Sequence, residues 1–221
     1  MSPTVWFLTG NTGKLAEANN HLTKLGYNVR QLIVENDQLY EPQAATLEIV
    51  AESKINQAIE HLPNEFVDGD MILVEDAGLF VSALDGFPGV YSSYVYSTIG
   101  NLGIIRLLSH LETEDPVSSA NLRAAQFKAV AVMWRDGEII VGEGICPGHI
   151  ATEPMEGNGF GFDPIFIPYD LDSEFQPLEA GTYGEHSTHG KTFGAVDVEV
   201  KGKFSHRSRA LKNLFSQLPS A

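Results

Sequence analysis

The sequence predicts an α/β fold with a mixed β-sheet arranged in two lobes. In the first part of the chain, short apolar runs rich in β-branched residues alternate with stretches whose apolar residues recur at helical spacing. The middle of the chain instead contains two apolar runs joined by a tight turn, which indicates an antiparallel pair. The 221 residues are 43% hydrophobic, enough for a sizeable core in one large domain or two small lobes.

Strands and helices are predicted to alternate in the first half. Three apolar, β-rich runs predict strands over residues 5–9, 28–34 and 71–74. Three stretches with helical spacing predict helices over residues 15–25, 46–62 and 98–111. Gly26 and Pro63 end the first two of these helices, because glycine adopts left-handed backbone angles readily and proline cannot continue a helix.

The second half is predicted to contain a hairpin, a long loop and a final helix. Residues 125–134 and 138–145 form two strands, and Arg135-Asp136-Gly137 supplies the turn between them. Residues 171–191 are rich in Gly, His, Ser and Thr without a clear period, so we expect a long, mobile excursion. Ser205 stands at the N-cap of the last helix. The apolar face of that helix consists of Ala210, Leu211, Leu214, Phe215 and Leu218.

Charge and cysteine content exclude several classes of protein. A formal net charge of −15 argues against non-specific binding to nucleic acid, which needs a basic surface. The single cysteine, Cys146, permits no intramolecular disulfide and fits a reducing compartment. The N-terminus lacks the basic region of a signal peptide, and no stretch approaches the ~18 apolar residues of a membrane span. We therefore expect a cytoplasmic protein with no membrane partner.

The first predicted turn is a candidate phosphate site. It reads Thr9-Gly10-Asn11-Thr12-Gly13-Lys14, and backbone N–H groups at a helix start, together with a lysine, can bind phosphate oxygens. It is not a Walker A loop, because its glycines are too close together and Leu15 stands where Ser or Thr would hold Mg²⁺. Taken alone, the turn is equally compatible with a simple connection and a solvated lysine.

Carboxylates after the third predicted strand form a candidate metal site. Glu75 and Asp76 follow an apolar run, where burying two carboxylates is costly unless a cation pairs with them. If the strand continued, their side chains would point to opposite faces. Glu41 is a further loop carboxylate, and carboxylates combine with phosphate oxygens and water to bind Mg²⁺. The alternative is an acidic strand end exposed to solvent.

A loop in which glycines alternate with aromatic rings is a candidate pocket for a planar base. It reads Gly157-Asn158-Gly159-Phe160-Gly161-Phe162-Asp163-Pro164-Ile165-Phe166. Phe160 and Phe162 offer flat apolar faces for stacking, Asp163 adds an acceptor, and glycine allows the backbone to approach a ligand closely. The alternative is a tight loop whose phenylalanines fill the core.

The densest cationic cluster of this acidic chain lies before and within the last helix. It comprises Lys201, Lys203, His206 and Arg207. With Ser205 as the N-cap, His206 and Arg207 lie in the first helical turn, where cations oppose the helix dipole. A nearby anionic or carbonyl group of a ligand would compensate. The alternative is a solvated basic face.

Together, these segments resemble the inosine/xanthosine triphosphate pyrophosphatase family. The matching stretches span nearly the whole chain and are Thr9-Gly10-Asn11-x-x-Lys14, Glu41, Val74-Glu75-Asp76-x-Gly78-Leu79, Gly89-x-Tyr91-Ser92, Gly159-Phe160-Gly161-Phe162-Asp163-Pro164-x-Phe166, Lys201 and Ser205-His206-Arg207. The resemblance implies a single domain over residues 1–221, with a long mixed sheet and an active-site cleft between two lobes. It also implies a homodimer and Mg²⁺-dependent hydrolysis of deaminated purine nucleoside triphosphates (ITP, dITP, XTP) to the monophosphate and pyrophosphate.

The resemblance also implies a role for each matching residue. Asp76 and Lys14 are catalytic, with Asp76 as the general base, and Glu41, Asp76 and nearby Glu75 form the Mg²⁺ site. Substrate is bound by Thr9, Gly10, Asn11, Thr12, Gly13, Lys14, Ala77, Phe160, Gly161, Phe162, Asp163, Lys201, His206 and Arg207. In this set the phenylalanine loop lines the base pocket, while His206 and Arg207 read the purine edge. Because Mg²⁺ lowers the pKa of a bound carboxylate, Asp76 is alternatively a group that orients the attacking water.

Two departures from the family pattern motivate alternative functions. Ala77 stands where the family usually has Ser or Thr, and Thr192-Phe193-Gly194-Ala195 lacks the acidic residue that often follows. One alternative is therefore a pyrophosphatase for another modified nucleotide. The other is a nucleotide-binding sensor without turnover, against which the presence of Lys14, Glu41 and Asp76 argues.

Overall fold

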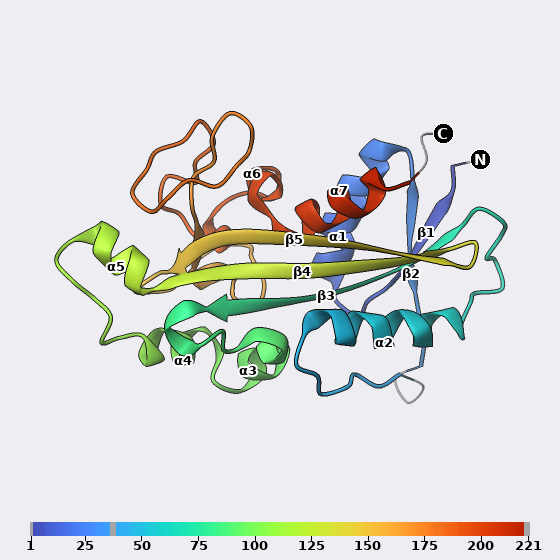
Figure 1. Cartoon of the computed structure of the whole chain (residues 1–221), viewed down its shortest axis with the longest axis horizontal. Helices are drawn as coiled ribbons and strands as arrows, with labels where there is room; N and C mark the ends of the chain where they lie inside the picture. The colour runs from blue at the N-terminus through green and yellow to red at the C-terminus, as the bar shows by residue number, and fades with distance from the viewer. Residues whose placement is uncertain (1, 36–38, 219–221) are drawn as a thin grey trace. The chain divides into compact units, whose positions relative to one another are not determined.

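The structure, a computed structural model, describes residues 2–35 and 39–218. These residues form a six-stranded sheet in the order β2-β1-β3-β4-β5-β6 (Figure 1). The strands are β1 (Thr4–Leu8), β2 (Asn28–Leu32), β3 (Met71–Val81), β4 (Ala124–Arg135), β5 (Glu138–Ile150) and β6 (Phe166–Pro168). β1 runs parallel to both β2 and β3, whereas β5 and β6 are antiparallel, which confirms the predicted mixed sheet.

Seven α-helices accompany the sheet in the described part of the chain. They are α1 (Thr12–Leu22), α2 (Leu47–Ile59), α3 (Ser92–Thr98), α4 (Gly100–Leu107), α5 (Pro116–Leu122), α6 (Val198–Phe204) and α7 (His206–Ser216). Among the described residues, no helix is long and apolar enough to span a bilayer.

The chain divides into two compact units, and each of the strands β3, β4 and β5 has residues in both. The first unit comprises Met1–Ala77, Ala129–Gly144 and His206–Ala221, and the second comprises Gly78–Lys128 and Ile145–Ser205. Each unit has its own apolar core.

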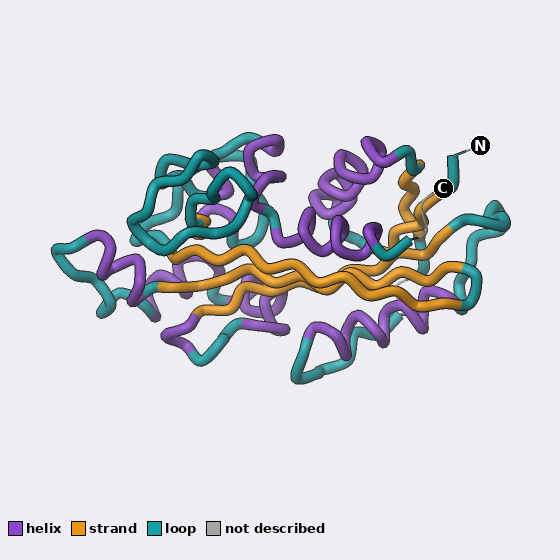
Figure 2. Tube along the Cα trace, turned by 45° about the horizontal axis from the view of Figure 1, so that its top comes forward, coloured by secondary structure: helices purple, strands orange, loops and turns teal. Residues whose placement is uncertain are grey.

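In the first unit, helices cover both faces of the strands. α1 and α7 lie on one face and α2 on the other (Figure 1, Figure 2). Met71 and Leu73 of β3 share a core with Leu211 and Leu214 of α7, as the predicted apolar face of the last helix requires. Odd-numbered residues of β3 therefore face α1 and α7, and even-numbered residues point the other way.

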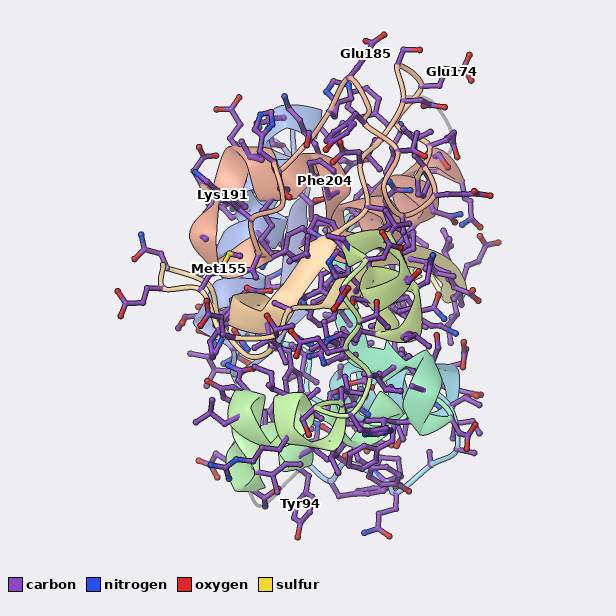
Figure 3. All side chains as sticks on the ribbon, turned by 90° about the vertical axis from the view of Figure 1, so that its left-hand side faces the viewer. Tyr94, Met155, Glu174, Glu185, Lys191 and Phe204 are labelled. Atoms are coloured by element: carbon purple, nitrogen blue, oxygen red, sulfur yellow. The ribbon has the colours of Figure 1, made fainter. Side chains whose placement is uncertain are left out.

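In the second unit, aromatic rings fill the core. Phe166 contacts Phe127 and Phe193, with ring centroids 4.6 and 5.3 Å apart. Figure 3 shows Phe204 of α6 inside this unit and Tyr94 of α3 pointing away from it; Phe204 is 1% exposed and Tyr94 70%.

Several predicted boundaries were wrong, for identifiable reasons. The helix predicted over residues 98–111 is shorter, because Gly100, with φ of 61°, separates α3 from α4. α3, α5 and α6 have only seven residues each, too few to show a helical period in the sequence. β3 continues past residue 74 through Glu75 and Asp76 to Val81, because a cationic side chain pairs with each of the two carboxylates.

The excursion over residues 171–191 forms loops, as predicted, but is not free of structure (Figure 2). Leu171 and His186 exchange both backbone hydrogen bonds, at 2.9 and 3.1 Å. The rings of Phe175 and His186 stack with centroids 4.2 Å apart. Glu174 and Glu185 mark its outer end in Figure 3. The expected mobile segment therefore has fixed backbone partners.

Candidate active site

The first unit contains the predicted phosphate-binding turn, at the start of α1. Asn11 is the N-cap, and its side-chain oxygen accepts hydrogen bonds from the backbone N–H groups of Gly13 (2.9 Å) and Lys14 (3.1 Å). Thr9 supports the turn, since its hydroxyl oxygen accepts from the N–H of Asn11 at 3.1 Å. Gly10 and Thr12 lie in the same turn. The geometry fixes the beginning of a helix, where N–H groups attract anions.

Lys14 extends from this turn to β3. Its Nζ donates to the backbone carbonyl of Glu75 at 3.3 Å and lies 3.7 Å from the Glu75 carboxylate. Burial lowers the pKa of Lys14, although the charges of Glu75 and Asp76 oppose this effect. The lysine is therefore tied to the strand that carries both candidate carboxylates.

Glu75 is the centre of a buried ion-pair network. Arg207 holds it with two bonds, from Nε to Oε2 at 2.6 Å and from Nη2 to Oε1 at 3.2 Å, and Nη1 of Arg207 donates to Glu17 at 2.5 Å. Burial acts to raise the pKa of Glu75, but the charges of Arg207 and Lys14 outweigh it and lower the pKa to about 2. Burial acts to lower the pKa of Arg207, and the two carboxylates reverse this and raise it.

This network supplies the negative charge that Arg207 needs at the start of α7. His206 and Arg207 are both buried in the first turn of that helix, where positive charge opposes the dipole. We expected a ligand to compensate, but for Arg207 the carboxylates of Glu17 and Glu75 do so from within the protein.

Asp76 points to the opposite side of β3 and meets a different cation. Nζ of Lys54, on α2, lies 2.7 Å from Oδ1 of Asp76 and 2.9 Å from Oε2 of Glu41. Burial raises the pKa of Asp76, although Lys54 and Lys14 oppose the rise. Burial acts to lower the pKa of Lys54, but Asp76 and Glu41 outweigh it and raise the pKa.

The donor set around Lys54 fits a hard divalent cation. Glu41 and Asp76 converge on one point, and their oxygens are the ligands that Mg²⁺ takes when substrate phosphates complete its shell. Glu75, predicted as a nearby metal residue, is instead bound by Arg207 on the other side of the strand. Among the described residues, no group of three or more His, Cys, Asp or Glu side chains is arranged to hold a metal.

The second unit contains the glycine and phenylalanine loop. Oδ2 of Asp163 accepts from the backbone N–H of Phe160 at 2.9 Å and pairs with Nζ of Lys201 at 2.7 Å. That Nζ lies 4.5 Å from the centre of the Phe160 ring and 5.6 Å from that of Phe193. Asp163 and Lys201 thus fix the loop and the half-buried ring of Phe160.

The two phenylalanines of the loop have different environments. Phe162 is 4% exposed and belongs to the core of the second unit, so it fits the alternative of a core residue. Gly159 is required by packing, because a Cβ there would lie 2.6 Å from Gly194. Gly161 has φ of 60° and no atom within 4 Å of a Cβ position. Between Gly159 and Asp163, the first three residues remain partly accessible, and Phe160 is the aromatic residue among them.

The segment after β3 has a structural role. Ser92 accepts a hydrogen bond from the N–H of Leu79 at 2.8 Å and donates one to the carbonyl of Gly89 at 2.7 Å. A Cβ at Gly78 would lie 2.3 Å from that carbonyl, which explains the glycine. Ala77, where a hydroxyl was expected, is partly buried against the core of the first unit.

Two residues of the site were missed by sequence reasoning. Lys54 lies on a correctly predicted amphipathic helix, where a lone lysine indicates a solvated face. Glu17 is likewise an ordinary helical position on α1, and its partner Arg207 is 190 residues away. No local spacing could have identified either residue. The only hint in the sequence was that the two candidate metal ligands, Glu41 and Asp76, had no predicted cationic side chain beside them.

Curated relatives share this sequence over almost its full length. The chain is 41% identical to the dITP/XTP pyrophosphatase of Thermococcus kodakarensis, covering 96% of this chain and 95% of the relative. It is 36% identical to the enzyme of the same name from Pyrococcus horikoshii, covering 97% and 96%. These relatives define the class: the protein is a hydrolase of the nucleoside triphosphate pyrophosphatase class.

The family follows from a direct match. The model of the Ham1 family matches residues 5–217. The fold is similar to that of the Staphylococcus aureus Ham1 protein, with a TM-score of 0.66 and 27% identity over 96% of both chains. A HAM1 protein from Coxiella burnetii has the same fold, with a TM-score of 0.68 and 24% identity over 97% of both chains. The chain belongs to the Ham1 family, which confirms the resemblance stated above.

Proposed function

We propose that the protein hydrolyses deaminated purine nucleoside triphosphates, namely ITP, dITP and XTP, to the monophosphate and pyrophosphate in a Mg²⁺-dependent reaction. The observation that carries the proposal lies within the first unit. There Lys14, at the N-terminus of α1, lies close to Glu75 of β3. The next residue of this strand, Asp76, and the loop residue Glu41 both contact the ammonium group of Lys54. A phosphate-binding site beside two carboxylates that can hold a metal ion is what hydrolysis of a phosphate anhydride requires. The dITP/XTP pyrophosphatases named above support the choice of nucleotide.

The proposed reaction is attack of water on the α-phosphorus. The water oxygen bonds to this phosphorus while the bond to the α–β bridging oxygen breaks, so pyrophosphate leaves with that oxygen. Lys14 and the positive end of the α1 dipole attract phosphate oxygens, and Asp76 orients the water and receives or redirects its proton. When bound at Glu41 and Asp76, Mg²⁺ would neutralise charge on the departing pyrophosphate.

We assign base recognition to the phenylalanine loop and to the start of α7. The partly accessible Phe160 offers the stacking face, while Asp163 and Lys201 hold that ring in place. A donor from His206 or Arg207 fits a 6-oxo group and rejects the 6-amino group of adenine, since the donor would stay unpaired. Because Arg207 donates hydrogen bonds to the carboxylates of Glu75 and Glu17, its primary role is to hold these side chains in position.

A substrate panel tests the proposal. ITP, XTP, dITP, GTP and ATP are incubated with Mg²⁺, and pyrophosphate and orthophosphate are measured separately. We expect pyrophosphate from the first three at much higher kcat/KM than from ATP. Release of orthophosphate, or equal use of ATP, would refute the assignment. A wider panel of nucleotides tests the alternative that the substrate is a different modified nucleotide. This alternative is motivated by Ala77, which has no hydroxyl group.

Asp76→Asn provides the matching test of mechanism. The amide keeps the size of the side chain but removes the charge, so we expect loss of at least about 100-fold in kcat with an unchanged fold. Asp68→Asn, at an exposed aspartate of the same unit, is the control. Near-normal turnover by the Asp76 variant would contradict the role.

We further propose a homodimer located in the cytoplasm, where free nucleotides occur. α3 and α4 expose large apolar side chains, among them Tyr94 (70%) and Leu102 (54%), which a second copy would cover. The buried thiol of Cys146, the single cysteine of the chain, is compatible with a reducing compartment. Light scattering with a Tyr94→Glu/Leu102→Asp double variant tests the dimer; an unchanged mass would exclude this face.

A further inference from the structure

We propose that Lys54 takes the place of the divalent cation between Glu41 and Asp76, so that metal and nucleotide bind cooperatively. The inference rests on the proposed function, since it concerns the same carboxylates. It assigns Lys54 a positioning role that follows from its contacts: its ammonium group satisfies both candidate metal ligands at once.

The geometry makes Lys54 and a metal ion competitors for the same oxygens. Nζ of Lys54 lies 2.7 Å from Oδ1 of Asp76 and 2.9 Å from Oε2 of Glu41. Mg²⁺ would sit about 2.1 Å from each ligand oxygen, which leaves no room for an ammonium group between the same two atoms. Metal binding therefore requires this side chain to move.

The charges around Lys54 also disfavour metal binding in the absence of a nucleotide. With Lys54 in place, two carboxylates face one cation, and Lys14 adds a second positive charge nearby. The adjacent carboxylate of Glu75 cannot compensate, because Arg207 holds it with two bonds on the other side of β3. The protein alone thus offers a divalent cation a weakly attractive site.

A bound triphosphate would favour both the movement of Lys54 and the binding of the metal ion. Lysine carries its charge on a flexible four-carbon stem, so the ammonium can move from the carboxylates to a phosphate oxygen. That move frees both carboxylates, while the phosphates supply further oxygen ligands to the metal. Each ligand then favours the other by the same factor, as thermodynamic linkage requires. Phosphate-free metal binding is disfavoured, and a nucleotide arriving with its metal is selected.

Binding of Mn²⁺ tests the inference without turnover. Free Mn²⁺ is titrated by electron paramagnetic resonance against the full-length protein, alone and with the α,β-methylene analogue of dITP, which cannot be cleaved at the scissile position. The proteins are wild type, Lys54→Met, Lys54→Gln and the control Lys24→Met, which removes an exposed lysine of the same unit.

Without nucleotide, we expect both Lys54 variants to bind Mn²⁺ at least about tenfold more tightly than wild type, and the control to match wild type. With the analogue, we expect wild type to gain most and the difference to disappear or reverse. Should Lys54→Met fail to fold, Lys54→Gln decides, because it keeps a polar side chain. Equal Mn²⁺ affinities of wild type and variants without nucleotide would overturn the inference.

The proposed function fails in a different way. If wild type binds no Mn²⁺ even with the analogue, and releases no pyrophosphate from ITP, both the function and this inference are refuted. If wild type hydrolyses ITP normally but removal of Lys54 leaves Mn²⁺ binding unchanged, only the role of Lys54 is refuted.

Discussion

Replacing Glu75 by glutamine tests how much the buried network contributes to stability. Burial acts to raise the pKa of Glu75, but Arg207 and Lys14 reverse this and lower it from 4.5 to about 2. At about 1.36 kcal/mol per pKa unit, this lowering corresponds to about 3 kcal/mol of unfolding free energy at neutral pH. Glutamine keeps the shape and one acceptor but lacks the charge, so Glu75→Gln should lose about that amount.

The loss should depend on pH in a defined direction. A carboxylate whose pKa is lowered by folding stabilises the protein above its unfolded pKa, here 4.5, and loses this effect as pH falls through about 2. We therefore expect a difference of about 3 kcal/mol between wild type and variant at pH 7, and about half as much at pH 3.

Urea unfolding followed by tryptophan fluorescence measures both values. Trp6 and Trp134 are the only tryptophans of the chain and both belong to the first unit, so the signal reports on the unit that contains Glu75. Glu52→Gln, at an exposed glutamate on α2, is the control and should change stability little. A difference below about 1 kcal/mol at pH 7, or one that does not shrink at pH 3, would refute the reasoning.

Three further predictions concern packing and stacking. Gly144→Ala should lower stability by about 1–3 kcal/mol in thermal unfolding, because its Cβ would lie 2.1 Å from a backbone atom of α7, whereas Gly202→Ala in α6 meets nothing and should be neutral or stabilising. Arg123→Met should cost about 2–4 kcal/mol in urea unfolding, since the buried guanidinium donates to three carbonyls at 2.7–2.8 Å; rescue by lysine would contradict this reason. Phe160→Ala should raise KM for ITP by about tenfold or more with a smaller change in kcat, while Phe162→Ala should mainly lower stability. Equal effects of the two phenylalanine changes on KM would refute the distinction between them.

Elements with a local signal could be predicted from sequence. The hairpin between β4 and β5 follows from Asp136 and Gly137, which take φ of 51° and 87° as such a turn requires. The helices predicted over residues 15–25 and 46–62 exist as α1 and α2, but their caps, Asn11 and Thr46, were not predicted. The short helices α3, α5 and α6 lacked this signal, because packing rather than periodicity stabilises them.

The contacts of the site were less predictable than its members. The matching motifs brought Lys14, Glu41 and Asp76 to attention, and the structure places all three in the first unit. Their partners come from distant positions: Lys54 is 22 residues from Asp76, and Arg207 is 132 residues from Glu75. Such pairs form only when helices pack on the sheet, so no pattern within a window of sequence encodes them.

The period of two in β3 explains why two adjacent carboxylates have different partners. The side chain of Glu75 points to the face covered by α1 and α7 and meets Lys14 and Arg207 there. Asp76 points to the face covered by α2 and meets Lys54. The first carboxylate is paired with a buried arginine, and the second with a partly exposed lysine, which we propose that a metal replaces. A shift of β3 by one residue would exchange these environments, so both the fold and the proposed metal site depend on the register of this strand.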